Sequence, residues 1–275
     1  MENAPQNIIE CEKVSVCFGK QTVLDELTLD VKRGERLVIL GGSGAGKSTL
    51  LNLLAGETRA TKGQVRIDGM DICRMTDRQL DDYRKTIGVL FQSGALFQSM
   101  TLGENVALPL REHTDLDEST IGTIVKMKLE LVGLREHAEK LPGQISGGMK
   151  KRAGLARALA MDPKILFYDE PSAGLDPVSV TEVDQLMIGL NDTLGVTTVV
   201  ITHEMTSAFR VAHRLVLLDQ GHFVAAGTPD EMRQSEDPLV YQFVNGLADG
   251  PLTDRRDRDA YKADLLETPT TVPSP

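Results

Sequence analysis

Residues 36–54, RLVILGGSGAGKSTLLNLL, decide the fold of this chain. The first five, RLVIL, predict a short buried strand. Residues 41–48 form a glycine-rich loop that fits the pattern GxxxxGK[ST], with Lys47 and Ser48 in register. The run STLLNLLAG then predicts a helix that begins near Lys47 and ends at Gly56. We therefore expect a strand, a phosphate-binding loop and a helix in direct succession.

The loop combines residue types that suit phosphate. Its glycines let backbone N–H groups face phosphate oxygens, and the positive end of the helix dipole points at the same place. Lys47 adds a full positive charge, and the Ser48 hydroxyl is expected to bind Mg²⁺. A glycine-rich turn with a purely structural role would not explain the lysine and the serine in register. The predicted nucleotide-binding residues of this segment are Gly41, Gly42, Ser43, Gly44, Ala45, Gly46, Lys47, Ser48 and Thr49.

Two adjacent carboxylates follow an apolar run farther along, in ILFYDE at residues 165–170. Asp169 can hold Mg²⁺ through water, and Glu170 can accept a proton from an attacking water, the general-base role in phosphoryl transfer. Adjacent acids at a strand end are also often helix caps or solvated groups. The phosphate-binding loop upstream favours the catalytic interpretation.

Around these motifs the sequence predicts an α/β protein. Residues 8–18 and 22–31 alternate in hydrophobicity and predict, together with 64–72, a small antiparallel sheet. Residues from about 95 to 160 have a helical pattern, with Glu118 and Ser119 at the expected start of one helix. The apolar runs in ILFYDEP, VTTVVITHE and RLVLLDQG predict core parallel strands. From residue 246 the chain becomes charged and rich in Pro and Thr, typical of a tail that is disordered in isolation.

Composition excludes several classes of protein. The 275 residues carry a net charge of -10, which disfavours a basic nucleic-acid binder. No apolar run approaches the roughly 20 residues of a membrane-spanning helix, and the N-terminus lacks the pattern of a secretion signal, so we expect a cytoplasmic protein. The three cysteines, Cys11, Cys17 and Cys73, show no CxxC spacing and predict neither a disulfide framework nor a zinc site.

A second glycine pair, Gly147-Gly148, follows Ser146 just before a predicted helix. Such a pair permits backbone donors to face an anion. Taken alone the signal is weak, because a linker followed by a basic amphipathic helix would look the same.

Six motifs in order give the chain a family resemblance. They are GGSGAGKST, FQSGALF, ISGGMKKR, ILFYDEP, SAGLDP and ITHE. Over residues 8–245 the chain resembles the ATP-binding subunits of ABC transporters. The resemblance implies a P-loop NTPase fold, an ABC cassette with a RecA-like core, an antiparallel β subdomain and an α-helical subdomain at about 95–160. Residues 246–275 would be a C-terminal tail, either a free linker or a strap that orders on a neighbouring subunit.

The resemblance also implies roles for residues outside the phosphate loop. Phe18 would stack on adenine, although an aromatic residue at a strand end is more often part of the core. Gln92 would contact Mg²⁺ and sense the membrane partner, and His203 would contact the γ-phosphate. Ser146, Gly147 and Gly148 would reach the nucleotide across a head-to-tail homodimer, and Asp176 would lie in the dimer-contact loop. Met149 stands where this family commonly has glutamine, so that side chain's hydrogen bond is lost.

A finer resemblance points to lipid transport. FQSGALF, NVALPLREHT, MKLELVGLR, SGGMKKR and NGLADGP are similar to the MlaF-type ATPases of MCE-linked phospholipid transport systems, whereas SAGLDP departs from the loop seen in many of them. The resemblance implies ATP and Mg²⁺ as cofactors and, as partners, an integral permease, an MCE-domain lipid-binding protein and a small STAS-domain subunit. It places the chain at the cytoplasmic face of the inner membrane, held by the permease.

Three alternatives remain at this point. An ATPase of an importer for amino acids or another small solute would share every nucleotide-binding residue. A soluble ABC protein acting on the ribosome or DNA usually needs paired cassettes, a coiled-coil insertion or zinc cysteines, which this sequence lacks. A nucleotide-binding regulator that never hydrolyses is disfavoured by Glu170.

Overall fold

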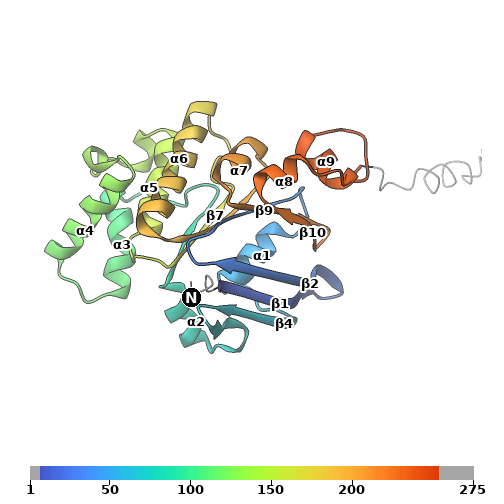
Figure 1. The fold of residues 1–275 in the computed structure, drawn as a ribbon. Coiled ribbons are helices and arrows are strands. Elements are labelled where there is room, and N and C mark those ends of the chain that lie inside the picture. The colour runs from blue at the N-terminus through green and yellow to red at the C-terminus, as the bar shows by residue number, and fades with distance from the viewer. Residues whose placement is uncertain (1–6, 254–275) are drawn as a thin grey trace, which may run out of the picture. The chain divides into compact units, whose positions relative to one another are not determined.

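The computed structural model describes residues 7–253 (Figure 1). The chain divides into two compact units, one up to Pro229 and one from Asp230 onward. Each unit is described by itself below. The first contains two β-sheets and most of the helices.

A six-stranded sheet forms the centre of the first unit. Its strands, in spatial order, are β10 (His222–Gly227), β9 (Arg214–Asp219), β3 (Arg36–Leu40), β8 (Thr197–Thr202), β7 (Ile165–Asp169) and β6 (Ile87–Leu90). All neighbours are parallel except β10, which pairs antiparallel with β9 at one edge. The central strands are almost wholly buried, as expected of a parallel sheet covered on both faces.

The second sheet is antiparallel and has four strands. They are β1 (Asn7–Phe18), β2 (Gln21–Lys32), β4 (Lys62–Ile67) and β5 (Met70–Asp71), in the spatial order β2-β1-β4-β5. The apolar and polar residues of β2 alternate between buried and exposed positions. The predicted antiparallel sheet and the predicted parallel core are both confirmed.

Helix α1 (Lys47–Leu54) lies between the two sheets (Figure 1). It contacts β2 of one sheet and β7 and β8 of the other. Its four leucines, at positions 50, 51, 53 and 54, are buried in a core cluster that both sheets share. Full burial of a leucine side chain contributes about 1.5–3 kcal/mol. The strand and helix that flank the phosphate loop are therefore fixed by the main hydrophobic core.

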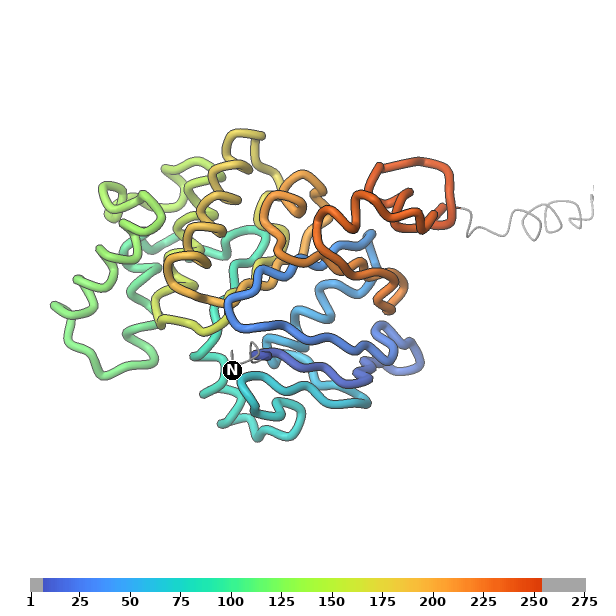
Figure 2. The backbone as a smooth tube through the Cα atoms, in the orientation of Figure 1, coloured from blue at the N-terminus to red at the C-terminus, as the bar shows by residue number. Residues whose placement is uncertain are grey.

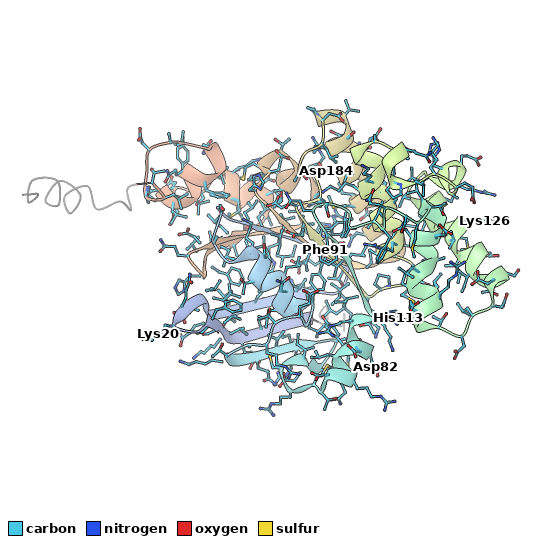
Figure 3. All side chains as sticks on the ribbon, turned by 180° about the vertical axis from the view of Figure 1, so that it is seen from behind. Lys20, Asp82, Phe91, His113, Lys126 and Asp184 are labelled. Carbon is cyan, nitrogen blue, oxygen red and sulfur yellow. The ribbon has the colours of Figure 1, made fainter. Side chains whose placement is uncertain are left out.

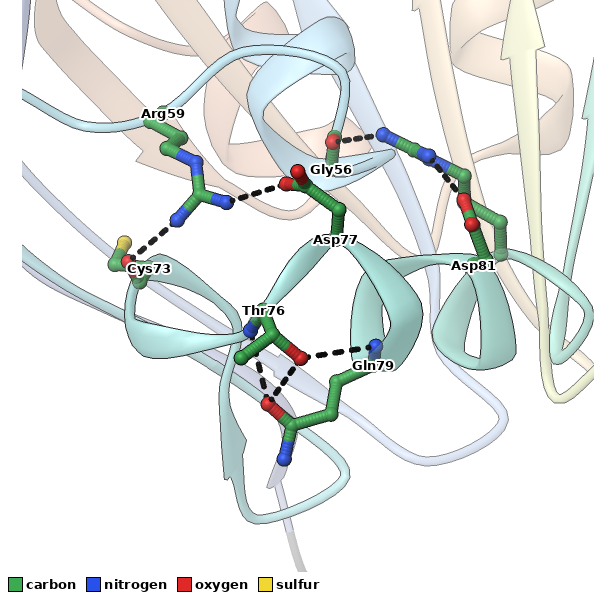
Figure 4. A network of polar contacts seen from close by, with 8 residues as sticks. Gly56, Arg59, Cys73, Thr76, Asp77, Gln79 and Asp81 are labelled. Atoms are coloured by element: carbon green, nitrogen blue, oxygen red, sulfur yellow. Dashed lines mark hydrogen bonds and ion pairs between the residues drawn. The ribbon is translucent and has the colours of Figure 1, made fainter.

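Helix α2 (Asp77–Arg84) follows a short 3₁₀ turn, η1 (Ile72–Arg74), and is held by polar contacts (Figure 4). Thr76 and Gln79 form a capping box at its start, in which each satisfies a backbone N–H of the other. At its end, the Arg84 guanidinium donates to the carbonyl oxygen of Gly56, just after α1. The helix is thereby attached to the end of α1.

Between β6 and β7 the chain leaves the sheet and forms helices gathered at one side of the first unit (Figure 2). These are α3 (Leu102–His113), α4 (Glu118–Leu131), η2 (Arg135–His137), η3 (Pro142–Gln144) and α5 (Gly147–Ala158). The predicted start of α4 was close: the helix does begin at Glu118, but Asp117 supplies the cap by accepting from the N–H groups of Ser119 and Thr120. A short carboxylate side chain is well suited to that position.

Two further helices complete the first unit, α6 (Pro177–Leu194) and α7 (Met205–Val211). The second unit contains α9 (Pro238–Asn245), and α8 (Pro229–Arg233) begins at the boundary between the units. Most of the predicted C-terminal tail, residues 254–275, lies outside the described residues. None of the helices in residues 7–253 combines the length and hydrophobicity needed to span a bilayer.

Candidate functional site

The predicted site residues follow the carboxyl ends of four neighbouring strands. The phosphate loop, residues 41–48, follows β3; His203 follows β8, Glu170 follows β7, and Gln92 lies two residues after β6. These strands are parallel and adjacent, so the four segments occur in that order along one edge of the sheet. Open α/β sheets bind their ligands outside this edge.

The phosphate loop is shaped to receive an anion. Gly46 precedes α1 with a φ of 107°, and α1 has no side-chain cap, whereas the other helices of eight or more residues within 7–253 each have one. The first N–H groups of a helix lack intrahelical partners and carry a partial positive charge. The Lys47 ammonium donates to the carbonyl oxygens of Gly41, at 2.8 Å, and Gly42, at 3.0 Å. The loop therefore presents unpaired donors with a positive charge beside them.

Two carboxylates and two ammonium groups form a charged cluster at the same edge. Burial raises the pKa of Asp169, and the charge of Glu170 raises it further, while Lys151 and Lys47 act in the opposite direction. Burial lowers the pKa of Lys47, and the attraction of Glu170 and Asp169 opposes that effect. The mutual influence of these groups shows that the structure brings together the phosphate loop and the acidic pair predicted from separate motifs.

Glu170 is the most constrained residue of the cluster. Its φ is +46°, a left-handed conformation that is unfavourable for a residue with a side chain. One carboxylate oxygen, Oε2, accepts from the Thr202 hydroxyl at 3.0 Å and from the His203 backbone N–H at 3.3 Å. The other, Oε1, lies 2.8 Å from His203 Nδ1. Because an ionised carboxylate only accepts, Nδ1 carries the proton in this pair. The structure thus places Glu170 and His203 in direct contact.

Gln92 and Phe18 are exposed at the ends of strands in different sheets. The Gln92 side chain makes no hydrogen bond within residues 7–253 and remains free to reach a ligand. Phe18 ends β1 and is 55% exposed, so the alternative of a core aromatic residue is wrong. An exposed ring at this place offers a face on which a base can stack.

The segment Ser146–Gly148 lies at the start of α5, as the sequence predicts. Ser146 caps the helix and accepts from the backbone N–H of Met149 at 3.2 Å. A Cβ added to Gly148 would lie 3.2 Å from Ser179 Oγ, near the start of α6. Asp176 caps α6 and binds Ser179. No hydrogen bond within residues 7–253 joins Ser146–Gly148 to the phosphate loop.

Sequence reasoning missed two residues of the site. Lys151 is only 5% exposed, and its ammonium donates to the backbone carbonyl oxygen of Glu170 at 3.0 Å. Thr202 is buried and donates to the Glu170 carboxylate. The run MKKR contains both Lys150 and Lys151, and residue type alone does not distinguish them. The structure does, because Lys151 lies on the buried face of α5. Thr202 was visible in the motif ITHE but was not singled out.

A groove of about 690 Å³ opens beside the segment that contains Gln92. Two exposed aromatic residues line it, Phe91 at 37% exposed and Phe97 at 51% exposed, together with Pro109 and His113 of α3. Three charged residues also line it, Asp81 and Arg84 of α2 and Lys85 just after that helix. Figure 3 labels two of these lining residues, Phe91 just after β6 and His113 at the end of α3. Exposed apolar side chains with a charged border are typical of a protein-binding surface.

Comparison with known proteins agrees with this geometry. The profile of the ABC transporter family matches residues 24–173. The intermembrane phospholipid transport system ATP-binding protein MlaF of Haemophilus influenzae is 42% identical over 262 residues, which cover 95% of this chain and 99% of that protein. The probable ribonucleotide transport ATP-binding protein mkl of Mycobacterium leprae is 44% identical over 263 residues, which cover 94% of this chain and 76% of that protein.

Among solved structures, a dimeric ATP-binding cassette in a post-hydrolysis state, bound to ADP and Pi, superimposes with a TM-score of 0.73. It is 31% identical in sequence, and the match covers 80% of this chain and 98% of that one. The similarity confirms the α/β fold with its antiparallel and parallel sheets.

Proposed function

Since this chain belongs to the ABC transporter family and is an ATPase that couples ATP hydrolysis to transport, we propose that it drives the movement of phospholipids between the inner and outer membranes of a cell envelope. The observation that carries the proposal is the end-to-end match to MlaF proteins. MlaF of Escherichia coli K12 is 41% identical, with 97% of this chain and 99% of that protein covered. The mkl proteins are similarly identical but longer, so that they match over only part of their length.

Glu170 is the proposed general base of hydrolysis. Its carboxylate accepts the proton of the water that attacks the γ-phosphate, and its contacts with Thr202 and His203 hold it at the sheet edge. His203 contributes through the same contact and lies on the side of the phosphate loop, since β8 is between β7 and β3. Lys47 and the uncapped start of α1 bind the phosphates.

The oxygen donors at this edge suit Mg²⁺. The Ser48 hydroxyl, the Asp169 carboxylate and the Gln92 amide oxygen are the hard ligands that this ion prefers, and it commonly keeps several waters as well. Burial and the neighbouring charge of Glu170 both disfavour the ionised form of Asp169. A divalent cation bound beside the two carboxylates would reduce this cost. Bound there with ATP, Mg²⁺ would neutralise charge that develops on the phosphates.

The nucleotide is proposed to lie between two copies of the chain. Within residues 7–253 of one chain no hydrogen bond joins Ser146–Gly148 to the phosphate loop, and solved structures of a similar ATP-binding cassette are dimeric. In a head-to-tail homodimer Ser146, Gly147 and Gly148 of one copy reach the γ-phosphate bound by the other, with Asp176 in the contact between them. Phe18, exposed at the end of β1, stacks on the adenine.

The membrane partners follow from the same assignment. The groove lined by Phe91 and Phe97 is proposed to receive a cytoplasmic helix of the permease, because it adjoins the loop that carries Gln92. A contact there would move Gln92 relative to the nucleotide. An MCE-domain lipid-binding protein and a STAS-domain subunit complete the proposed complex, which holds the chain at the cytoplasmic face of the inner membrane. No nucleic acid takes part.

The test is a transfer assay with the reconstituted complex and Glu170→Gln. We expect ATP binding within a few-fold of the unsubstituted protein, turnover lowered at least 100-fold as for loss of a general base, and no ATP-driven phospholipid transfer. Glu12→Gln is the matched control, since Glu12 is 61% exposed and its ion pair among residues 7–253 is with Arg66 on the antiparallel sheet. Phospholipid transfer that persists with Glu170→Gln would refute the proposal.

The rival function is the ATPase of an importer for amino acids or another small solute. Affinity purification in mild detergent separates the two. Recovery of an MCE-domain protein, a permease and phospholipid supports lipid transport. Recovery of a solute-binding protein with a different permease keeps the ATPase and overturns the lipid assignment.

A further inference from the structure

Helix α5 contacts more of the site than its first residues suggest. At its start, Ser146 caps the helix at the segment proposed to face the partner's nucleotide. In its middle, Lys151 reaches the residue after β7. At its end, the Arg157 guanidinium donates to the carbonyl oxygens of Ala95, at 2.7 Å, and Gly94, at 3.3 Å, in the loop that carries Gln92. One rigid element thus connects three parts of the ATPase.

Packing leaves this helix little freedom to move independently. A Cβ added to Gly154 would lie 2.8 Å from the carbonyl oxygen of Gly94 and 2.9 Å from the Leu90 side chain. Glycine is therefore required where α5 meets the end of β6. Atoms packed this closely transmit displacement directly. A movement of the loop after β6 would therefore also move α5.

Lys151 is an unusual residue to find in this packing. A lysine with 5% of its surface exposed pays a desolvation cost unless its charge is compensated. Here the ammonium donates to the Glu170 carbonyl oxygen and lies within the electrostatic reach of the Asp169 and Glu170 carboxylates. An amphipathic helix that needed only a core residue at this position would carry an aliphatic side chain.

The contact acts on a backbone that requires support. Glu170 holds a φ of +46°, which for a residue with a side chain costs on the order of 1–3 kcal/mol. Its N–H donates to the Ile201 carbonyl at 2.9 Å, and its own carbonyl accepts from Lys151 and from the Ala173 N–H, at 3.2 Å. Lys151 is the only one of these partners that belongs to α5. Its loss would leave the carbonyl with the Ala173 N–H and weaken the link between α5 and Glu170.

We propose that Lys151 is a positioning residue for hydrolysis, which holds the backbone of Glu170 and couples its carboxylate to the movement of α5. The proposal rests on the assignment of Glu170 as the general base. The carboxylate must lie within hydrogen-bond reach of the attacking water, and a shift of about 1 Å in such a group costs on the order of 100-fold in rate. The proposed effect of Lys151 passes through Glu170, whose carbonyl oxygen its ammonium contacts.

The first test measures kcat and the KM for ATP of Lys151→Met and Lys151→Arg. Each variant is the full-length chain, purified in mild detergent together with the membrane subunits that bind it. Lys151→Met removes the donor and keeps an aliphatic chain, so we expect kcat to fall roughly tenfold or more and the KM for ATP to change less than twofold. Lys151→Arg keeps the charge and a donor, and we expect it to recover most of kcat. A kcat within twofold of the unsubstituted protein for Lys151→Met, or no recovery with arginine, would overturn the proposal.

Lys128→Met is the matched control. Lys128 is also a buried lysine of the helical segment, 7% exposed, and pairs with Asp162 away from the charged cluster. We expect its loss to lower the melting temperature without lowering kcat per folded molecule. If Lys151→Met and Lys128→Met lower kcat equally, the effect is a general loss of stability and the proposal fails.

A double-mutant cycle shows whether Lys151 acts through Glu170. In the background of Glu170→Gln, adding Lys151→Met is expected to slow residual turnover less than twofold, because coupled residues are non-additive. An undiminished tenfold loss there would show an independent role and refute the proposal. Failure of Glu170→Gln alone to slow turnover would instead refute the assignment of the general base, so the two failures are distinguishable.

Discussion

Gly46 has a backbone conformation and surroundings that exclude a side chain. Its φ is 107°, and an added Cβ would lie 2.7 Å from the Leu24 side chain and 3.1 Å from the Val23 carbonyl oxygen. We expect Gly46→Ala to lower the free energy of unfolding by about 1–3 kcal/mol and to weaken ATP binding at least tenfold, as measured by denaturation and nucleotide titration. Gly42→Ala is the contrast: its Cβ would meet no atom within 4 Å, so the free energy of unfolding should change little. Equal destabilisation by the two would contradict the argument.

At the same scale, the sequence predicted residue identity better than residue conformation. Lys47, Ser48 and Asp169 were predicted from spacing, residue type and the order of their motifs, and their roles stay predictions. The left-handed backbone of Glu170 and the contact from Lys151 were not predicted, because they arise where α5 packs against the end of β7. A sequence pattern records which residues a segment contains and not which distant carbonyl a lysine will reach.

At the scale of elements, Asp68 ties together three connections between strands. It lies in the turn between β4 and β5 and pairs with Arg33, between β2 and β3, and with Lys164, just before β7. Hydrogen bonds from Lys164 and Arg33 hold its pKa below the usual value. A carboxylate whose pKa is lowered on folding adds stability that is present above its ordinary pKa of about 3.9 and is lost as the pH falls through the lowered value.

We therefore expect Asp68→Asn to lower the free energy of unfolding by about 1 kcal/mol at pH 7, since both cations are partly exposed. Asparagine tolerates the positive φ of this turn, so the change reports charge rather than backbone strain. Urea denaturation of both proteins at pH 7 and pH 3 checks it: the difference should shrink at the lower pH. A difference that is the same at both pH values would exclude the electrostatic explanation.

The elements themselves were largely predictable. The strands of the antiparallel sheet, the four inner strands of the central sheet and the helix after the phosphate loop have strong periodicity or a diagnostic motif, and the structure has them where the sequence predicts. Both edge strands of the central sheet were missed. The residues of β10, HFVAAG, alternate between exposed and half-buried positions, and β6, IGVL, has only four residues, so neither gives a strong signal. The limits predicted for the domains, 8–245 from the family resemblance and 246–275 from composition, stay a prediction.

For the whole molecule, the proposed contact of Ser146–Gly148 with a nucleotide bound by a second copy predicts assembly. We expect Glu170→Gln to form a dimer in Mg²⁺ and ATP, with a mass twice that of the single chain by size exclusion with light scattering. Adding Ser146→Arg should prevent the dimer and leave ATP binding to the single chain within a few-fold, because Ser146 belongs to the face proposed for the partner and loss of its cap on α5 costs only about 1 kcal/mol. A dimer that persists with Ser146→Arg would contradict the head-to-tail arrangement.

The positions of the three cysteines decide where dyes can be attached to follow motion within the chain. Cys11 and Cys17 lie on β1 and Cys73 lies in η1, so the helices from α3 to α5 contain no thiol. Burial raises the pKa of Cys11 to about 12, which keeps it from reacting with maleimides. Lys126→Cys introduces a thiol at an exposed position of α4, labelled in Figure 3. Once Cys73 is replaced, Cys17 and the new cysteine can carry the donor and acceptor dyes. Energy transfer between dyes at positions 17 and 126 would report how the distance between the antiparallel sheet and helix α4 changes during a single turnover.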